Sequence, residues 1–189
     1  MRNFKELIIF IKEDLNRLSN TKNSYFKLIK FLITNASFKV TFWFRLGSYL
    51  KDKKYLKPLY FLSFIIYKMV QFKTGIQLPI GTTVGKGLQF SHFSCIVINN
   101  DVIIGDYCTI FQGVTIGSVR GKGAPRLGNH VVLAAGSKVL GNVSIGNFVF
   151  IGANAVVISD VIDLSVMGGI PAKVLNYNGK KNTLMYLHN

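Results

Sequence analysis

Apolar residues in the first 73 positions recur at the three- and four-residue spacing of amphipathic helices. Phe4, Leu7, Ile8, Ile11 and Leu15 fall on one helical face. Polar breaks separate three further predicted helices, which begin after Ser24, run over about residues 38–50, and cover about residues 56–72. The pattern therefore predicts an α-helical N-terminal region over residues 1–73.

After residue 74 the apolar positions follow a period of six residues. Each unit describes one short strand and one corner, and three units close a coil of about eighteen residues. Residues 76–103 continue the pattern in a slipped register. We predict a mainly β protein, a parallel β-helix of about four to five coils over residues 74–176 with a tail over residues 177–189. The repeat positions, all aliphatic, are Ile104, Ile110, Ile116, Leu127, Leu133, Val139, Ile145, Ile151 and Val157.

One step in this frame is eleven residues long, from Ile116 to Leu127. The additional residues must leave the coil at a corner, so we expect a protruding loop that carries Arg120, Lys122 and Arg126. The two cysteines, Cys95 and Cys108, form no disulfide framework and match no metal-ligand spacing, which is typical of a reducing compartment. We expect a cytoplasmic protein.

Positive charge is concentrated in the helical region. The whole chain has a formal net charge of +15, and residues 1–73 hold 15 Lys and Arg against 4 acids. The most apolar stretch, residues 59–67, is bounded by Lys57 and Lys68 and is too short to span a bilayer. A basic segment rich in Phe, Tyr, Leu and Ile indicates peripheral association with an anionic membrane through residues 1–73, or simply a solvated basic face.

Three segments carry a resemblance to a known family. They are His92-Phe-Ser-Cys-Ile-Val-Ile98, the run from Gly105 to Gly117, and Gly168-Gly-Ile-Pro-Ala-Lys-Val174. They resemble the left-handed β-helix (hexapeptide-repeat) acyltransferases, in the serine O-acetyltransferase-like branch that includes capsule and exopolysaccharide O-acetyltransferases. The resemblance covers about residues 75–176. It implies a left-handed coil, acetyl-CoA as acetyl donor, and a homotrimer with active sites between subunits.

A hydroxyl group must lose its proton as it attacks a thioester, and histidine is a suitable base near neutral pH. The chain has three histidines, and His92 matches the position of the family's catalytic base, whereas His130 and His188 do not. The carboxylate that orients this base in serine acetyltransferases corresponds to Gln77, and a substrate-contacting histidine is replaced near Ala124. Asp101 and Asp106 are further candidates for stabilising the imidazolium.

CoA binding requires basic groups for the phosphates and small residues where the pantetheine arm follows a coil. Several of these glycines and alanines are also explained by the repeat itself. The expected CoA-binding residues are Gly117, Ser118, Arg120, Lys122, Arg126, Ala134, Ala135, Gly136, Lys138, Gly152 and Lys173.

Three functions compete. Because the amino-acid contacts are altered and the helical region is basic, we expect an O-acetyltransferase that acts on a saccharide acceptor, of capsular or exopolysaccharide type. The alternatives are a serine O-acetyltransferase of cysteine biosynthesis and a non-catalytic basic scaffold. We expect no metal, because two histidines in the repeats are too few for a three-histidine site, and no nucleic-acid partner, because no recognition motif is present.

Overall fold

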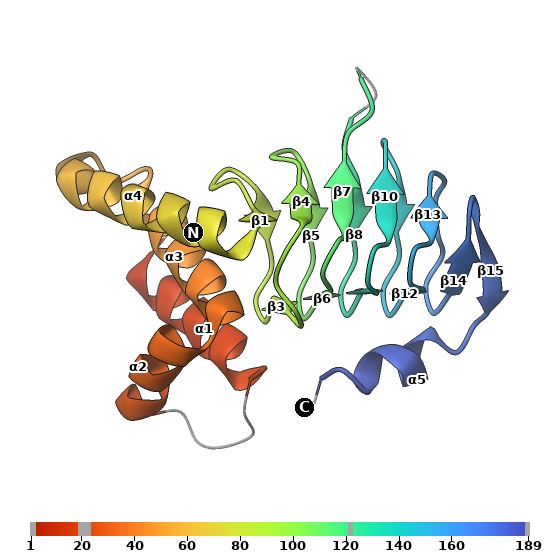
Figure 1. The fold of residues 1–189 in the computed structure, drawn as a ribbon, viewed down its shortest axis with the longest axis horizontal. Helices are drawn as coiled ribbons and strands as arrows, with labels where there is room; N and C mark the ends of the chain where they lie inside the picture. The colour runs from red at the N-terminus through yellow and green to blue at the C-terminus, as the bar shows by residue number, and fades with distance from the viewer. Residues whose placement is uncertain (1–2, 19–23, 121–122, 188–189) are drawn as a thin grey trace.

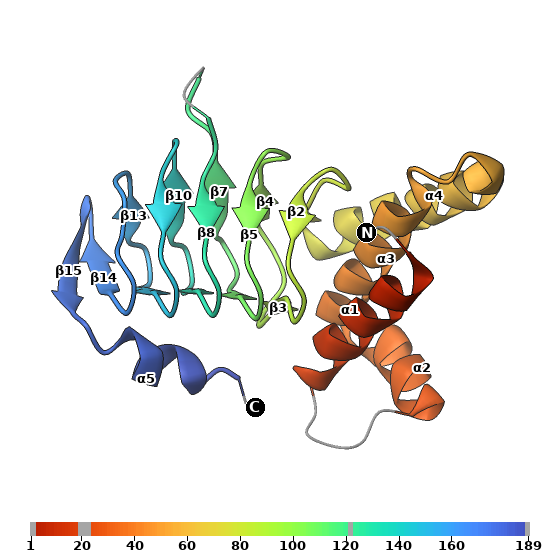
Figure 2. The ribbon, with the colours of Figure 1, turned by 180° about the vertical axis from the view of Figure 1, so that it is seen from behind.

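The computed structural model describes residues 3–18, 24–120 and 123–187. Four helices are followed by a parallel β-helix whose coils are stacked side by side (Figures 1 and 2). The predicted parallel β-helix with an N-terminal helical region is thereby confirmed. The helices are α1 (Phe4–Asn16), α2 (Tyr25–Thr34), α3 (Ala36–Leu50) and α4 (Lys57–Thr74), with a short 3-10 helix (Lys54–Leu56) before α4.

The first three helices begin where a short polar side chain accepts a backbone N–H. Asn3, Ser24 and Asn35 accept from Glu6, Lys27 and Phe38 respectively. These contacts satisfy N–H groups that have no partner within the helix. Helix α4 begins differently, with Pro58 in its first turn, and it ends at Gly75 in the left-handed conformation. None of the helices in the described part of the chain is long and apolar enough to cross a membrane.

The coils form three sheets, here named A, B and C. Neighbouring strands in each sheet are parallel, except for β15, which returns antiparallel along β14. Sheet A contains β1 (Ile76–Gln77), β4 (Ile96–Ile98), β7 (Thr115–Gly117), β10 (Lys138–Leu140) and β13 (Val156–Val157). Sheet B contains β2 (Thr83–Val84), β5 (Ile103–Ile104), β8 (Arg126–Leu127) and β11 (Ser144–Ile145). Sheet C contains β3 (Gln89–Phe90), β6 (Thr109–Ile110), β9 (Val132–Leu133), β12 (Phe150–Ile151), β14 (Val166–Gly169) and β15 (Ala172–Asn176).

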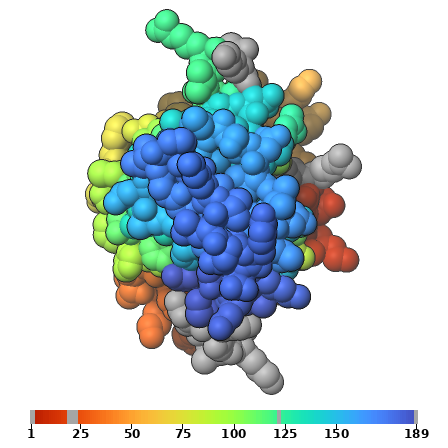
Figure 3. Space-filling model, turned by 90° about the vertical axis from the view of Figure 1, so that its right-hand side faces the viewer, coloured from red at the N-terminus to blue at the C-terminus, as the bar shows by residue number. Residues whose placement is uncertain are grey.

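The six-residue frame corresponds to the inward columns of this β-helix. All nine aliphatic positions of the frame belong to one buried cluster, and none is more than 4% exposed. Ile104, Leu127 and Ile145 are register partners in sheet B, for example. The eleven-residue step is the loop between β7 and β8, and its described residues, 118–120 and 123–125, stand out from the coils (Figures 1 and 3).

The helical region covers the first coil. Val40 and Phe44 of α3 and Tyr67 of α4 belong to the same buried cluster as the coil residues. The Tyr67 hydroxyl and the Gln71 amide both donate to the carbonyl oxygen of Leu78, at 2.5 and 3.0 Å. The helices therefore close one end of the aliphatic core.

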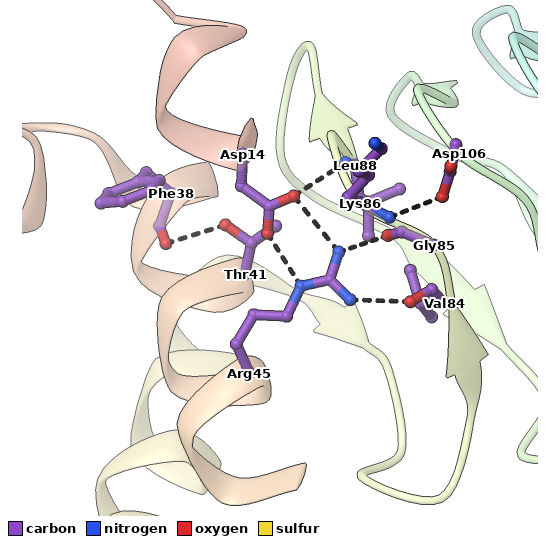
Figure 4. Close-up of polar contacts among 9 residues, drawn as sticks. All are labelled: Asp14, Phe38, Thr41, Arg45, Val84, Gly85, Lys86, Leu88 and Asp106. Carbon is purple, nitrogen blue, oxygen red and sulfur yellow. Dashed lines mark hydrogen bonds and ion pairs between the residues drawn. The ribbon is translucent and has the colours of Figure 1, made fainter. Parts of the chain in front are cut away.

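A buried ion pair ties these helices to the coil (Figure 4). Arg45 Nε lies 2.9 Å from Asp14 Oδ2, and both side chains are 1% exposed. The same guanidinium donates to the carbonyl oxygens of Val84 and Gly85, and Asp14 accepts the Leu88 N–H at 2.9 Å. Two helices and the first coil are thus joined through one pair of charges.

Candidate functional site

His92 lies at the corner between sheets C and A, here the C–A corner. In the other coils, the inward-facing residues on the two sides of this corner are six positions apart, as Ile110 and Ile116 are. At the His92 corner the corresponding inward-facing residues are Phe90 and Ile98, the register partners of Ile110 and Ile116. They are eight positions apart. The slipped register is therefore a two-residue enlargement of the corner that carries His92.

The enlarged corner contains strained backbone. Ser94 and Cys95 have φ values of 106° and 52°, in the region that favours glycine. A positive φ recurs at the equivalent place in the next coils, at Gly113, Gly136 and Asn154, so the value at Cys95 belongs to the repeat and the value at Ser94 is the one special to this corner. Here the Ser94 carbonyl accepts the Gly113 N–H at 3.0 Å, which fixes the corner to the next coil.

His92 is exposed at this corner and accessible to a substrate. No hydrogen bond joins its ring to another residue in the described part of the chain; the nearest ring, that of Phe111, lies 6.0 Å away between centroids. Gln77 is on β1, where it pairs with Val97, and the described contacts include none between Gln77 and His92. The expected orienting partner is therefore not in place within one chain.

The two aspartates considered for the same role lie at other corners. Asp106 accepts the Lys86 N–H at 2.9 Å at the corner between sheets B and C. Asp101 follows β4 at the corner between sheets A and B. Neither carboxylate is placed at the C–A corner of the same chain, and the candidate role of Asp101 or Asp106 toward the imidazolium stays a prediction.

Part of the expected CoA set shares the C–A corner with His92. Ala134, Ala135 and Gly136 lie two coils further along, and Gly152 lies three coils along. Backbone bonds connect the successive corners, with Gly136 N–H donating to Gln112 and Asn154 N–H to Ala135, both at 2.9 Å. The Lys138 ammonium donates to the Gly113 carbonyl oxygen. These residues form a row parallel to the β-helix axis.

The remaining residues of that set lie elsewhere. Gly117 ends β7 at the corner between sheets A and B, and Ser118 and the exposed Arg120 follow it; Arg126 is exposed on β8. Lys122 lies outside the described residues. Lys173 is exposed on β15, opposite Gly168. Gly117, Ser118, Arg120 and Arg126 therefore lie across sheet A from the C–A corner, whereas Lys173 lies on sheet C at the end nearer that corner.

The other candidate residues have structural explanations. The His130 ring is stacked between Tyr107 and Phe148, with centroids 5.2 and 4.5 Å away, at the corner between sheets B and C. Burial lowers the pKa of His130, which favours the neutral form of the ring. Burial also raises the pKa of the Cys108 thiol to about 12, which makes this core residue a poor nucleophile. His188 lies outside the described residues.

The glycines of the site separate into two kinds. A Cβ on Gly152 would lie 2.9 Å from the Met167 carbonyl oxygen, so coil stacking alone requires that glycine. A Cβ on Gly117 would meet nothing closer than 3.5 Å, at a Leu140 methyl group. Packing therefore does not explain Gly117, and its expected role at the CoA site stays a prediction.

This difference gives a prediction. Gly152→Ala should lower the melting temperature, because the neighbouring backbone must shift, whereas Gly117→Ala should leave it within about 2 °C. If CoA passes over Gly117, the added methyl group should raise the KM for acetyl-CoA. Thermal unfolding and steady-state kinetics of both variants check this, and an unchanged KM in Gly117→Ala would remove Gly117 from the CoA site.

Among the described residues, no group of three or more His, Cys, Asp or Glu side chains gathers as a metal site would require.

The contact of His92 with Phe111 was not predicted from the sequence. Phe111 is nineteen positions away, and only the stacking of one coil on the next brings the two rings together. The eight-residue spacing around His92 was the available signal for an unusual corner.

Comparison with known proteins agrees with this fold. Residues 124–159 match the model of the bacterial transferase hexapeptide (six repeats) family. A serine acetyltransferase of Bacillus subtilis is 34% identical over 177 residues, which are 90% of this chain and 78% of that protein. One from Staphylococcus xylosus is 41% identical over 130 residues, 67% of this chain and 60% of the relative's length. A serine acetyltransferase structure in complex with CoA superimposes with a TM-score of 0.75 at 23% identity, covering 91% of this chain and 71% of that one.

The parallel β-helix and its repeat define a hexapeptide-repeat acyltransferase, and the chain belongs to that family. Its relatives named above are serine acetyltransferases. The expected saccharide acceptor, and with it the capsule and exopolysaccharide branch, was therefore wrong. That expectation depended on Gln77, on Ala124 and on the basic helical region. Ala124 is only 8% exposed and belongs to the buried core, so its identity reflects packing.

Proposed function

We propose that this chain is an acetyl-CoA-dependent O-acetyltransferase that transfers the acetyl group to the hydroxyl of L-serine. The observation that carries the proposal is the match to serine acetyltransferases over 90% of the chain, with His92 as the one histidine exposed at a C–A corner of the described coils. The CoA in the complexed serine acetyltransferase supports the choice of donor.

In the proposed reaction His92 acts as general base. Its free imidazole nitrogen takes the serine hydroxyl proton as the oxygen attacks the thioester carbonyl of acetyl-CoA. The resulting tetrahedral intermediate collapses with cleavage of the C–S bond, and the imidazolium returns the proton to the departing CoA sulfur. The products are O-acetylserine and CoA, and no metal or redox partner is needed.

The positions of the charged residues favour a homotrimer. Arg120 and Arg126 lie near one edge of sheet A, whereas His92 and Lys138 lie at the other. In a lateral trimer, the edge that carries His92 would face the basic loop of a neighbouring subunit, so the two groups would share one CoA. Lys173 and the small residues of the C–A corner would line the same groove.

Thiol release tests the activity. With acetyl-CoA and L-serine, the protein should release CoA and form a product heavier than serine by one acetyl group. L-alanine is the matched acceptor control, because it lacks only the hydroxyl and should give no more than background hydrolysis. Equal thiol release with serine and alanine would reject serine as acceptor.

We also propose that the protein is cytoplasmic and that α4 associates peripherally with the inner face of an anionic membrane. Its outer face carries exposed apolar side chains bordered by Lys57, Lys68 and Lys73. Apolar residues flanked by lysines suit a surface of negative lipids, each basic residue contributing about 1 kcal/mol. The exposed apolar residues are Leu59, Phe61, Leu62, Ile65, Met69 and Phe72.

Sedimentation with liposomes tests the membrane association. The protein should bind vesicles that contain phosphatidylserine and should be released by high salt, because screening weakens the lysine contacts. Ile65→Ser should reduce binding, while Val119→Ser, an exposed apolar residue of the loop, serves as the control. Absence of binding to both anionic and neutral vesicles would restrict the helical region to covering the first coil.

A further inference from the structure

The chain beyond β15 turns back along the coils and brings an aromatic side chain toward the corner of His92. Helix α5 (Gly179–Leu184) and the residues after it run back along the coils toward the N-terminal half (Figures 1 and 2). The Tyr186 ring lies edge-on to Phe111, with 5.5 Å between centroids and 87° between planes. Phe111 in turn lies 6.0 Å from the His92 ring.

The returning segment is fixed at two places. Gly179 donates its N–H to the Leu164 carbonyl oxygen at 2.8 Å, and a Cβ there would lie 2.2 Å from the Phe148 carbonyl oxygen. At the other end, Tyr186 stacks on Phe150 with 6.0 Å between centroids and 27° between planes. The segment therefore holds Tyr186 against sheet C rather than in solvent.

We infer that Phe111, held by Tyr186, positions the His92 imidazole for proton transfer, so that the segment after β15 forms part of the acyl-transfer site. This inference rests on the proposed role of His92. No described hydrogen bond orients this imidazole, so the contact with Phe111 is the one described side-chain contact that does. An aromatic ring also attracts the imidazolium that forms during attack, where a carboxylate is lacking.

Enzyme kinetics provide the first test. Phe111→Ala should lower kcat by about 3- to 10-fold and change the KM for acetyl-CoA by less than about twofold, because positioning acts on the transition state. Phe111→Tyr should restore kcat, since it keeps the ring. Phe93→Ala is the matched control: Phe93 is next to His92 and 50% exposed, and its ring makes no described aromatic contact.

Coupling between the two rings provides the second test. Tyr186→Ala should lower kcat and Tyr186→Phe should not. The double variant with Phe111→Ala should lose less than the product of the single losses, because Tyr186 acts through Phe111. Multiplicative losses, or a kcat of Phe111→Ala equal to that of the original protein, would overturn the inference.

Nuclear magnetic resonance separates this inference from the choice of acceptor. With histidine labelled in its ring, the His92 resonance, assigned by its absence in His92→Ala, should move in Phe111→Leu. The His130 resonance should stay in place, because that ring stacks at another corner. The shift is measured without substrate, so an unmoved His92 resonance overturns the contact whether or not serine is the acceptor.

Discussion

Replacing His92 by alanine should reduce acetyl transfer by about 10²- to 10⁴-fold, the usual contribution of a general base. The hydroxyl of serine is a weak nucleophile at neutral pH, and no other described residue at the C–A corner carries an imidazole or a carboxylate that could accept its proton. Because His92 is exposed and makes no hydrogen bond in the described part of the chain, the substitution should leave the fold intact.

CoA binding and the oligomeric state of His92→Ala should therefore match those of the unchanged protein, by calorimetry and by light scattering. The matched control is His130→Phe, which keeps a ring between Tyr107 and Phe148 and should keep full activity. Turnover of His92→Ala within tenfold of the original rate would show that another group takes the proton.

Replacing Arg45 by alanine should lower the free energy of unfolding by about 3–5 kcal/mol. The change would leave the Asp14 carboxylate buried without its partner and would remove two donors from the carbonyl oxygens of Val84 and Gly85. Breaking a buried pair costs far more than losing an exposed charge, because the remaining charge has neither water nor a counter-ion.

Urea unfolding at one protein concentration measures this loss. Arg45→Lys should be intermediate, since an ammonium keeps the charge but cannot reproduce the guanidinium contacts. Lys51→Ala, on an exposed residue that follows the same helix, should change stability by no more than about 0.5 kcal/mol. A loss below about 1 kcal/mol in Arg45→Ala would mean that the helices are joined to the coil mainly by apolar contacts.

The helices and the β-helix could be predicted because both produce a regular spacing of apolar residues along the sequence. Three- and four-residue apolar steps and a six-residue frame need only near neighbours in sequence. The Asp14–Arg45 pair could not be predicted, since its members are 31 positions apart and no local pattern links them. The contact of His92 with Phe111 could not be predicted either, because it depends on how one coil lies on the next and not on neighbours in sequence.

The acceptor was mispredicted for a different reason. The loss of a substrate-contacting histidine near Ala124 was interpreted as a change of acceptor, but the side chain of Ala124 is buried in the core. A small residue indicates a nearby ligand only where the fold would leave space for a larger side chain at that position. Gly117 meets that condition and Gly152 does not.

The helices over the first coil also limit how copies of this chain can associate. A β-helix with a bare end offers unpaired strand edges, on which a second copy could continue the sheets as in a growing fibre. Here Phe44 and Tyr67 occupy that end, and at the opposite end β15 runs against the direction of the other strands. Addition of a second copy is therefore hindered over the first coil by the helices, and at the opposite end at the edge of sheet C that β15 covers.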